Sequence, residues 1–152
     1  VRVGDYVSSE SCFNATKGLK TLSIRLKKHS INAQKIFNYL ESHSYIDDIF
    51  FLPDVNNKFH KLWKKYFNLH NGLITFSLKK KKNIKKFVDS LKLFKIGFSW
   101  GGYESLILPI KTIKPSKKIS KNSKYWFRIH VGLESCDDLI NDLEKALLNY
   151  EK

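Results

Sequence analysis

Apolar residues recur at helical intervals over the first 43 residues and predict one long helix over about 9–43, with Lys and Arg on its other face. Ser8 and Ser9 are suitable N-caps for it. Gly18 predicts close packing inside this helix, because a Gly there costs about 1 kcal/mol relative to Ala. The apolar stripe consists of Ala15, Leu19, Leu22, Leu26, Ala33, Phe37 and Leu40.

The remaining chain alternates short apolar strands with amphipathic helices. Strands are expected over 46–52, 74–78, 93–98 and 126–131, and helices over 56–67, over 84–91 and from Ser135 through Tyr150. In the first of these helices, Phe59, Trp63 and Phe67 form an aromatic stripe that predicts core packing. The stretch 109–124 is rich in Lys and Ser and is expected to be an exposed loop. This order predicts the α/β class, as a two-layer sandwich of a small sheet with helices packed on it.

Length and hydropathy favour a single domain over 1–152, with an α/β body over 46–152. No run of about 18 apolar residues predicts a membrane span, and no signal peptide is visible. Free thiols at Cys12 and Cys136 and a cytoplasmic location are therefore expected. The chain starts at Val1 and contains no Met, so we expect a fragment that lacks its original N-terminus, or a processed product.

A net charge of +14 comes from 28 basic and 14 acidic residues, and only Arg2, Arg25 and Arg128 are arginines. A basic module that binds nucleic acid is one hypothesis, although such modules usually use Arg for bidentate contacts. The alternative is that Lys, Asn and Ile accumulated together through compositional drift on solvated faces. The second interpretation is favoured.

Two adjacent glycines stand in the stretch Phe98–Leu106, after an apolar segment. Glycine adopts positive φ angles readily and lets the backbone approach another group closely. The pair predicts a tight turn between core elements, or a backbone wall against a ligand.

Arg128 is the sharpest single candidate for binding, because it is the only Arg in the second half of the chain. A guanidinium binds a carboxylate through two parallel hydrogen bonds, which Lys cannot do. The alternative is a surface ion pair. Strand alternation puts Trp126 and His130 on the same face as Arg128, and His130 is expected to be structural rather than a base. The histidines show no metal-ligand spacing, and no nucleophile or nucleotide motif is present.

Several motifs occur in the order found in the Cys/Met-metabolism pyridoxal-phosphate (PLP) enzymes, which include the cystathionine β-lyases. The chain is similar to this family across nearly its whole length, and the motifs together are highly specific. They are K-G-L-K-T-L at 17–22 followed by Arg25-Leu26, H-K-L-W-K at 60–64, S-W-G-G-Y-E-S-L at 99–106, R-I-H-V-G-L-E at 128–134 and D-D-L-I at 137–140.

The resemblance implies the C-terminal domain of a fold-type I PLP enzyme, with PLP as cofactor and no metal. It implies a carbon–sulfur lyase that cleaves cystathionine, an amino-acid thioether, into homocysteine, pyruvate and ammonia in transsulfuration and methionine biosynthesis. By the same resemblance Arg128 binds the substrate α-carboxylate, and Ser99 and Trp100 line the same pocket.

The family's Schiff-base lysine, pyridine-binding Asp, stacking Tyr and phosphate-binding loop lie upstream of the motifs found here. We therefore expect no catalytic and no cofactor-binding residue in this chain, and a missing N-terminal PLP domain as partner. A homo-oligomer, by resemblance a tetramer, is also expected. An inactive remnant of such an enzyme is the alternative, and no membrane partner is expected.

Overall fold

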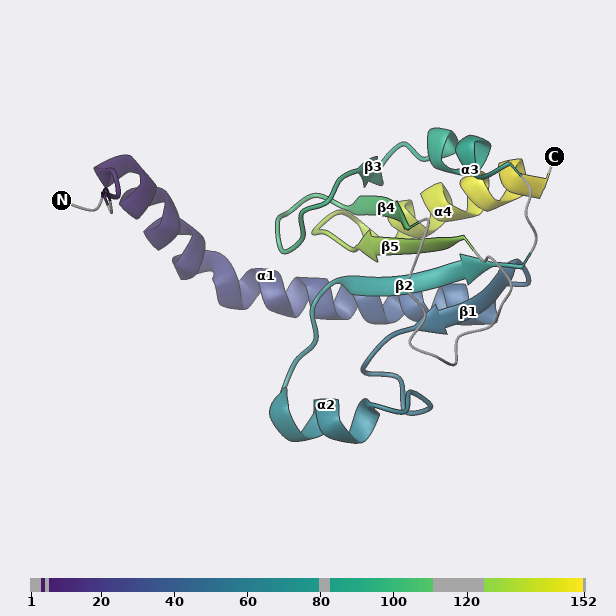
Figure 1. Ribbon diagram of the computed structural model, residues 1–152, viewed down its shortest axis with the longest axis horizontal. Coiled ribbons are helices and arrows are strands. Elements are labelled where there is room, and N and C mark those ends of the chain that lie inside the picture. The colour runs from purple at the N-terminus through teal and green to yellow at the C-terminus, as the bar shows by residue number, and fades with distance from the viewer. Residues whose placement is uncertain (1–3, 5, 80–82, 111–124, 152) are drawn as a thin grey trace.

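Four helices and five strands follow one another in the computed structural model, which describes residues 4, 6–79, 83–110 and 125–151. Their arrangement is a mixed sheet with helices packed on it, so the predicted α/β class is confirmed (Figure 1). The elements are α1 (Ser9–Ser42), β1 (Ile46–Phe50), α2 (His60–Tyr66), β2 (Leu73–Leu78), α3 (Ile84–Ser90), β3 (Lys95–Ile96), β4 (Leu106–Ile110), β5 (Trp126–His130) and α4 (Cys136–Glu151).

The five strands form one sheet in the order β1-β2-β5-β4-β3. All neighbouring pairs are antiparallel except β3 and β4, which are parallel. The register places Ile129 of β5 opposite Ile74 of β2 and Ile107 of β4, and all three are buried. Alternation along β5 then directs Arg128 to the other face.

Helices α1, α3 and α4 supply the core on one face of the sheet (Figure 1). The apolar stripe predicted for the last helix is confirmed, because every member of it is buried. Complete burial of one Leu contributes about 1.5–3 kcal/mol, so this stripe anchors the C-terminal helix firmly. Its members are Leu139, Leu143, Ala146, Leu147 and Tyr150.

The N-terminal half of α1 extends beyond the sheet (Figure 1). The helix itself is confirmed, but of its apolar stripe only Ala33, Phe37 and Leu40 are buried, whereas Leu19 is 69% exposed. A Cβ on Gly18 would have no heavy atom within 4 Å. The prediction of close packing at Gly18 is therefore wrong for the described chain. No described helix is long and apolar enough to cross a membrane.

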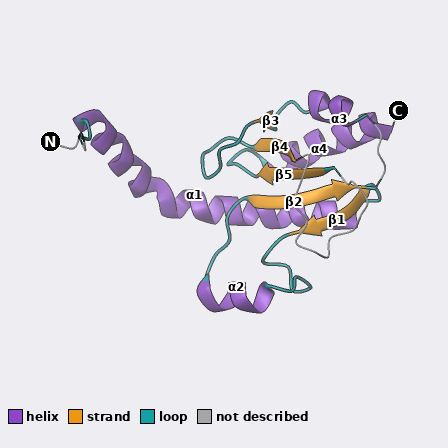
Figure 2. Ribbon diagram, in the orientation of Figure 1, coloured by secondary structure: helices purple, strands orange, loops and turns teal. Residues whose placement is uncertain are grey.

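Helix α2 is set apart from the sheet by loops (Figure 2), and none of its residues is buried. The flanking Phe59 and Phe67 are 43% and 58% exposed, so the predicted core stripe is wrong. Helical spacing identifies an apolar face but does not show what covers it. The helix also starts later than predicted, because side chains of Asp54 and Asn57 accept nearby backbone N–H groups and stabilise turns instead.

Strand β4 was not predicted, because Pro109 favoured a loop from that residue onward. β4 pairs with β3 only through Leu106 and Ile107, so Pro109 lies where β4 has become an edge strand. A missing backbone N–H is tolerated at such an edge. The strand predicted over 93–98 is shortened to Lys95–Ile96. Residues 111–124 of the predicted loop lie outside the described residues.

Candidate functional site

A row of four side chains crosses the face of the sheet opposite the helical core. Cα pairing aligns Phe50 with Thr75, Thr75 with Arg128, and Arg128 with Leu108. Residues paired in this way point to the same side of a sheet. Arg128 is therefore presented from the middle of the sheet, between β2 and β4, on the face that α1 and α4 leave uncovered.

Arg128 binds the backbone of the glycine-containing loop between β3 and β4. Its Nη2 donates a hydrogen bond to the carbonyl oxygen of Phe98, and its Cζ lies 5.1 Å from the centroid of the Phe98 ring. Ser99 and Trp100 follow directly and are exposed, Trp100 by 57%. The structure thus brings Arg128 to the residue that adjoins the other two predicted site residues. Their role in binding substrate stays a prediction.

Gly101 is held through both of its backbone polar groups. Its carbonyl accepts a hydrogen bond from Nη1 of Arg25 at 2.8 Å, and its N–H donates to Nε2 of His130 at 3.1 Å. The φ angle of Gly101 is +86°. A residue with a side chain would be strained at this φ angle, so the loop needs a glycine here.

His130 is buried, with 2% of its surface exposed, although strand alternation had put it on the polar face. Burial lowers the pKa of His130 below its ordinary value, helped by the nearby His29 and Arg128 and opposed by the Gly102 carbonyl and Glu134. A neutral imidazole can accept the Gly101 N–H only at an unprotonated Nε2. This arrangement favours the structural role expected for His130.

The other end of the same loop is fastened by Glu134. The backbone N–H and the hydroxyl of Ser105 donate to the two carboxylate oxygens of Glu134, each at 2.8 Å. The Gly132 N–H donates in turn to the Ser105 hydroxyl oxygen at 2.8 Å. A Cβ on Gly132 would lie 2.6 Å from the carbonyl carbon of Glu104, so only glycine fits there. The loop is therefore tied to the β5–α4 connection.

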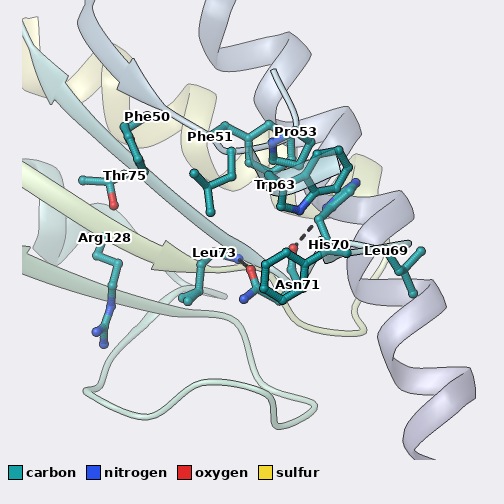
Figure 3. A pocket seen from close by; sticks show the side chains of 12 residues that line it. Phe50, Phe51, Pro53, Trp63, Leu69, His70, Asn71, Leu73, Thr75 and Arg128 are labelled. Atoms are coloured by element: carbon teal, nitrogen blue, oxygen red, sulfur yellow. Dashed lines mark hydrogen bonds between the residues drawn. The ribbon is translucent and has the colours of Figure 1, made fainter. Parts of the chain in front are cut away.

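A hollow of about 270 Å³ lies beside Arg128 on the open face of the sheet. Figure 3 shows Arg128 and Thr75 at one end of it and Trp63 and His70 at the other. Its lining is mostly apolar and aromatic, with few polar groups. The lining residues are Phe50, Phe51, Leu52, Pro53, Trp63, Phe67, Leu69, His70, Asn71, Leu73, Thr75 and Arg128.

These lining residues do not fit PLP on their own. The cofactor needs a lysine amine for its aldehyde, and the described lining contains neither a lysine nor a carboxylate. It does contain one guanidinium beside apolar walls, which suits a small ligand that carries a carboxylate. No group of three His, Cys, Asp or Glu side chains that could hold a metal occurs among the described residues.

Arg25 and Glu134 are the site residues that sequence reasoning did not select. Arg25 lies 76 residues from Gly101 along the chain, and Glu134 lies 29 residues from Ser105. Glu134 had no partner within its own segment. The signal that could have identified Arg25 is the one used for Arg128, namely an arginine kept in a chain whose basic residues are otherwise nearly all lysine.

Residues 1–148 match the family described as Cys/Met metabolism PLP-dependent enzyme. The chain is 35% identical over 150 residues to cystathionine β-lyase MetC of Escherichia coli, covering 93% of this chain and 38% of that protein. It is 38% identical over 150 residues to an L-alanine/L-glutamate racemase of Wolbachia pipientis, covering 95% of this chain and 37% of that protein. The chain thus spans about two fifths of the length of these relatives.

A similar solved structure is cystathionine γ-lyase from Lactobacillus plantarum, complexed with L-serine. It superposes with a TM-score of 0.85 at 30% identity, over 99% of this chain and 41% of that chain. The fold of the described residues is therefore similar to that of about two fifths of this larger enzyme.

Proposed function

The chain belongs to the family of Cys/Met metabolism PLP-dependent enzymes, and we propose on that basis that it forms the C-terminal part of a carbon–sulfur lyase. The proposed reaction is β-elimination of cystathionine to homocysteine, pyruvate and ammonia. The identity with the Escherichia coli cystathionine β-lyase and the S-W-G-G-Y-E-S-L sequence at 99–106 support this choice.

One observation carries the proposal, namely that Arg128 stands beside a hollow and is bound to Phe98, the residue before Ser99 and Trp100. A guanidinium has five N–H donors, and the bond to the Phe98 carbonyl uses one of them. Two parallel N–H groups can then bind a substrate α-carboxylate. The Phe98 ring beneath the guanidinium restricts its orientation.

PLP held by residues outside this chain would supply electron withdrawal at the α-carbon of the amino acid. In the proposed enzyme the lysine that carries PLP lies outside this chain, and the residues present bind and orient the substrate carboxylate. Ser99 and Trp100 are not among the residues that line the hollow, and by this proposal they contact the substrate from the adjoining loop. By the same proposal the partner is a PLP-binding domain, the assembly is a homo-oligomer and the location is the cytoplasm.

A racemase is the second candidate, because the Wolbachia relative is 38% identical to this chain. Both reactions act on an amino acid whose α-carboxylate needs the same recognition, so the role of Arg128 is common to them. An inactive remnant and a basic nucleic-acid-binding module are the further alternatives, and they predict no turnover.

The experiment is a fusion in which this chain replaces the matching segment of Escherichia coli cystathionine β-lyase. We expect the PLP-loaded fusion to release pyruvate from L-cystathionine. Arg128→Lys should lower kcat/KM roughly 30-fold, about 2 kcal/mol, through loss of the bidentate contact. D-alanine formed from L-alanine would favour the racemase. A PLP-loaded fusion that turns over neither substrate contradicts both, and salt-sensitive binding of duplex DNA would then favour the nucleic-acid module.

A further inference from the structure

We propose that Arg25 and His130 are positioning residues that hold Gly101 by its carbonyl and its N–H, and so keep Phe98–Trp100 beside Arg128 for substrate binding. This inference rests on the function proposed above. It concerns two residues that lie far apart in the chain, Arg25 in α1 and His130 in β5.

Arg25 is itself held in place by its own helix. Its Nη2 donates to the Gly18 carbonyl at 2.9 Å and its Nε to the Thr21 hydroxyl oxygen at 3.3 Å, while Nη1 donates to Gly101 at 2.8 Å. These three bonds use three separate N–H-bearing nitrogens of the guanidinium fork, which the single nitrogen of an ammonium group does not provide. The loop therefore meets a donor whose position is fixed before the bond forms.

The two described arginines bind the same loop. Arg128 binds the carbonyl of Phe98, and Arg25 binds the carbonyl of Gly101, three residues further on. The chain has 28 basic residues and only three are Arg. Arginine thus occurs at the two described positions where a planar donor holds this loop, one on each side of Ser99 and Trp100.

His130 binds the other polar group of Gly101, its N–H. Its Nε2 accepts the Gly101 N–H at 3.1 Å and lies 3.3 Å from the Gly102 carbonyl oxygen. His29 packs against it with ring centroids 4.9 Å apart, and Arg128 and Glu134 are the charged groups near it. A neutral acceptor in a buried position keeps the loop amide from water.

The loop needs such fixation because its aromatic side chains bury little surface. Phe98 is 75% exposed, Trp100 57% and Tyr103 68%. Backbone that is not held by burial loses conformational entropy when a ligand orders it. Prior fixation of Gly101 removes part of that cost and favours ligand binding at Ser99 and Trp100.

The experiment measures amide hydrogen exchange in the loop 97–104 of the 152-residue chain, together with its affinity for L-serine by NMR titration. Arg25→Gln should speed loop exchange by about tenfold or more, since a charge-assisted hydrogen bond is lost. His130→Leu should do the same, whereas His130→Gln keeps an acceptor and should retain slow exchange. Lys27→Gln, which removes a charge from the exposed side of α1, is the matched control.

Serine affinity in Arg25→Gln should fall while Arg128 itself is intact. Unchanged loop exchange in Arg25→Gln overturns the proposal, and so does an equal rise in β2 and α4, which would indicate general destabilisation. Failure of His130→Gln to restore slow exchange in comparison with His130→Leu also counts against it. If the unmodified chain binds no serine, the proposed function fails, and loop exchange alone decides whether Arg25 and His130 hold Gly101.

Discussion

The carboxylate of Asp142 accepts a hydrogen bond from the backbone N–H of Phe94 at 3.2 Å, across 48 residues of chain. It also accepts the N–H groups of Lys92 and Leu93, each at 2.8 Å. One buried side chain on α4 thus satisfies three consecutive backbone donors between α3 and β3. This contact fixes where β3 begins, and so where the loop that carries Ser99 starts.

Asp142→Ala should lower the free energy of unfolding by about 2–4 kcal/mol, because it leaves one buried and two partly buried backbone donors without this partner. Urea denaturation of the chain measures this change. Glu144→Ala on the exposed side of the same helix is the control and should change stability by about 0.5 kcal/mol or less. Equal effects of the two substitutions would show that the three hydrogen bonds do not contribute as described.

The two cysteines should differ in reactivity. Cys12 is exposed, whereas Cys136 is buried and its burial raises the pKa of the thiol. Because the thiolate is the reactive form, iodoacetamide at pH 7.5 should label Cys12 first and reach Cys136 only after denaturant is added. Peptide mass spectrometry measures the two rates. Similar rates in the native chain would contradict the burial of Cys136.

Protonation of His130 should lower the free energy of unfolding of the chain as the pH falls. Burial lowers the pKa of His130 below 6.5, so the folded state favours the neutral ring. The unfolded chain then binds more protons than the folded chain. The contribution of the neutral ring to the free energy of unfolding is therefore complete above about pH 6.5, and it is lost as the pH falls through the pKa of His130 in the folded state. His43 and His70, whose pKa values burial also lowers, act in the same direction.

Urea midpoints at pH 7.5 and pH 5 measure this dependence. His130→Gln removes one titrating group while keeping the hydrogen-bond acceptor, so its midpoint should fall less than that of the unmodified chain. A larger fall in the variant than in the unmodified chain would reverse the sign expected from linkage.

Elements with a complete local signature could be predicted from the sequence. The last helix begins at Cys136, directly after the Ser135 expected at its start, and it has the expected acidic residues in its first turn and the expected buried stripe from Leu139 to Tyr150. β4 was missed because Pro109 was judged from its neighbours alone, and a proline favours a loop. The strand forms because it pairs with β5, which is another segment of the chain. The exposure of α2 was missed for a similar reason, because helical spacing identifies an apolar face but not the segment that packs against it.

Only part of the candidate site could be predicted from the sequence. A single Arg among lysines and a glycine pair after an apolar segment identified Arg128 and the loop. The bonds from Arg25 and Glu134 to that loop join distant segments, and no periodicity or spacing encodes them. The departure of His130 from strand alternation arises because the loop covers it, which is also a tertiary effect.

The most direct measurement of the central claim is an NMR titration of the labelled chain with L-serine and with ethanolamine, which lacks the carboxylate. We expect saturable shifts at the Arg128 side chain and at the Ser99 and Trp100 amides with serine alone. Arg128→Lys should weaken this binding about tenfold or more. Equal shifts with ethanolamine, or unchanged serine affinity in Arg128→Lys, would contradict the assignment of Arg128 as the carboxylate-binding residue.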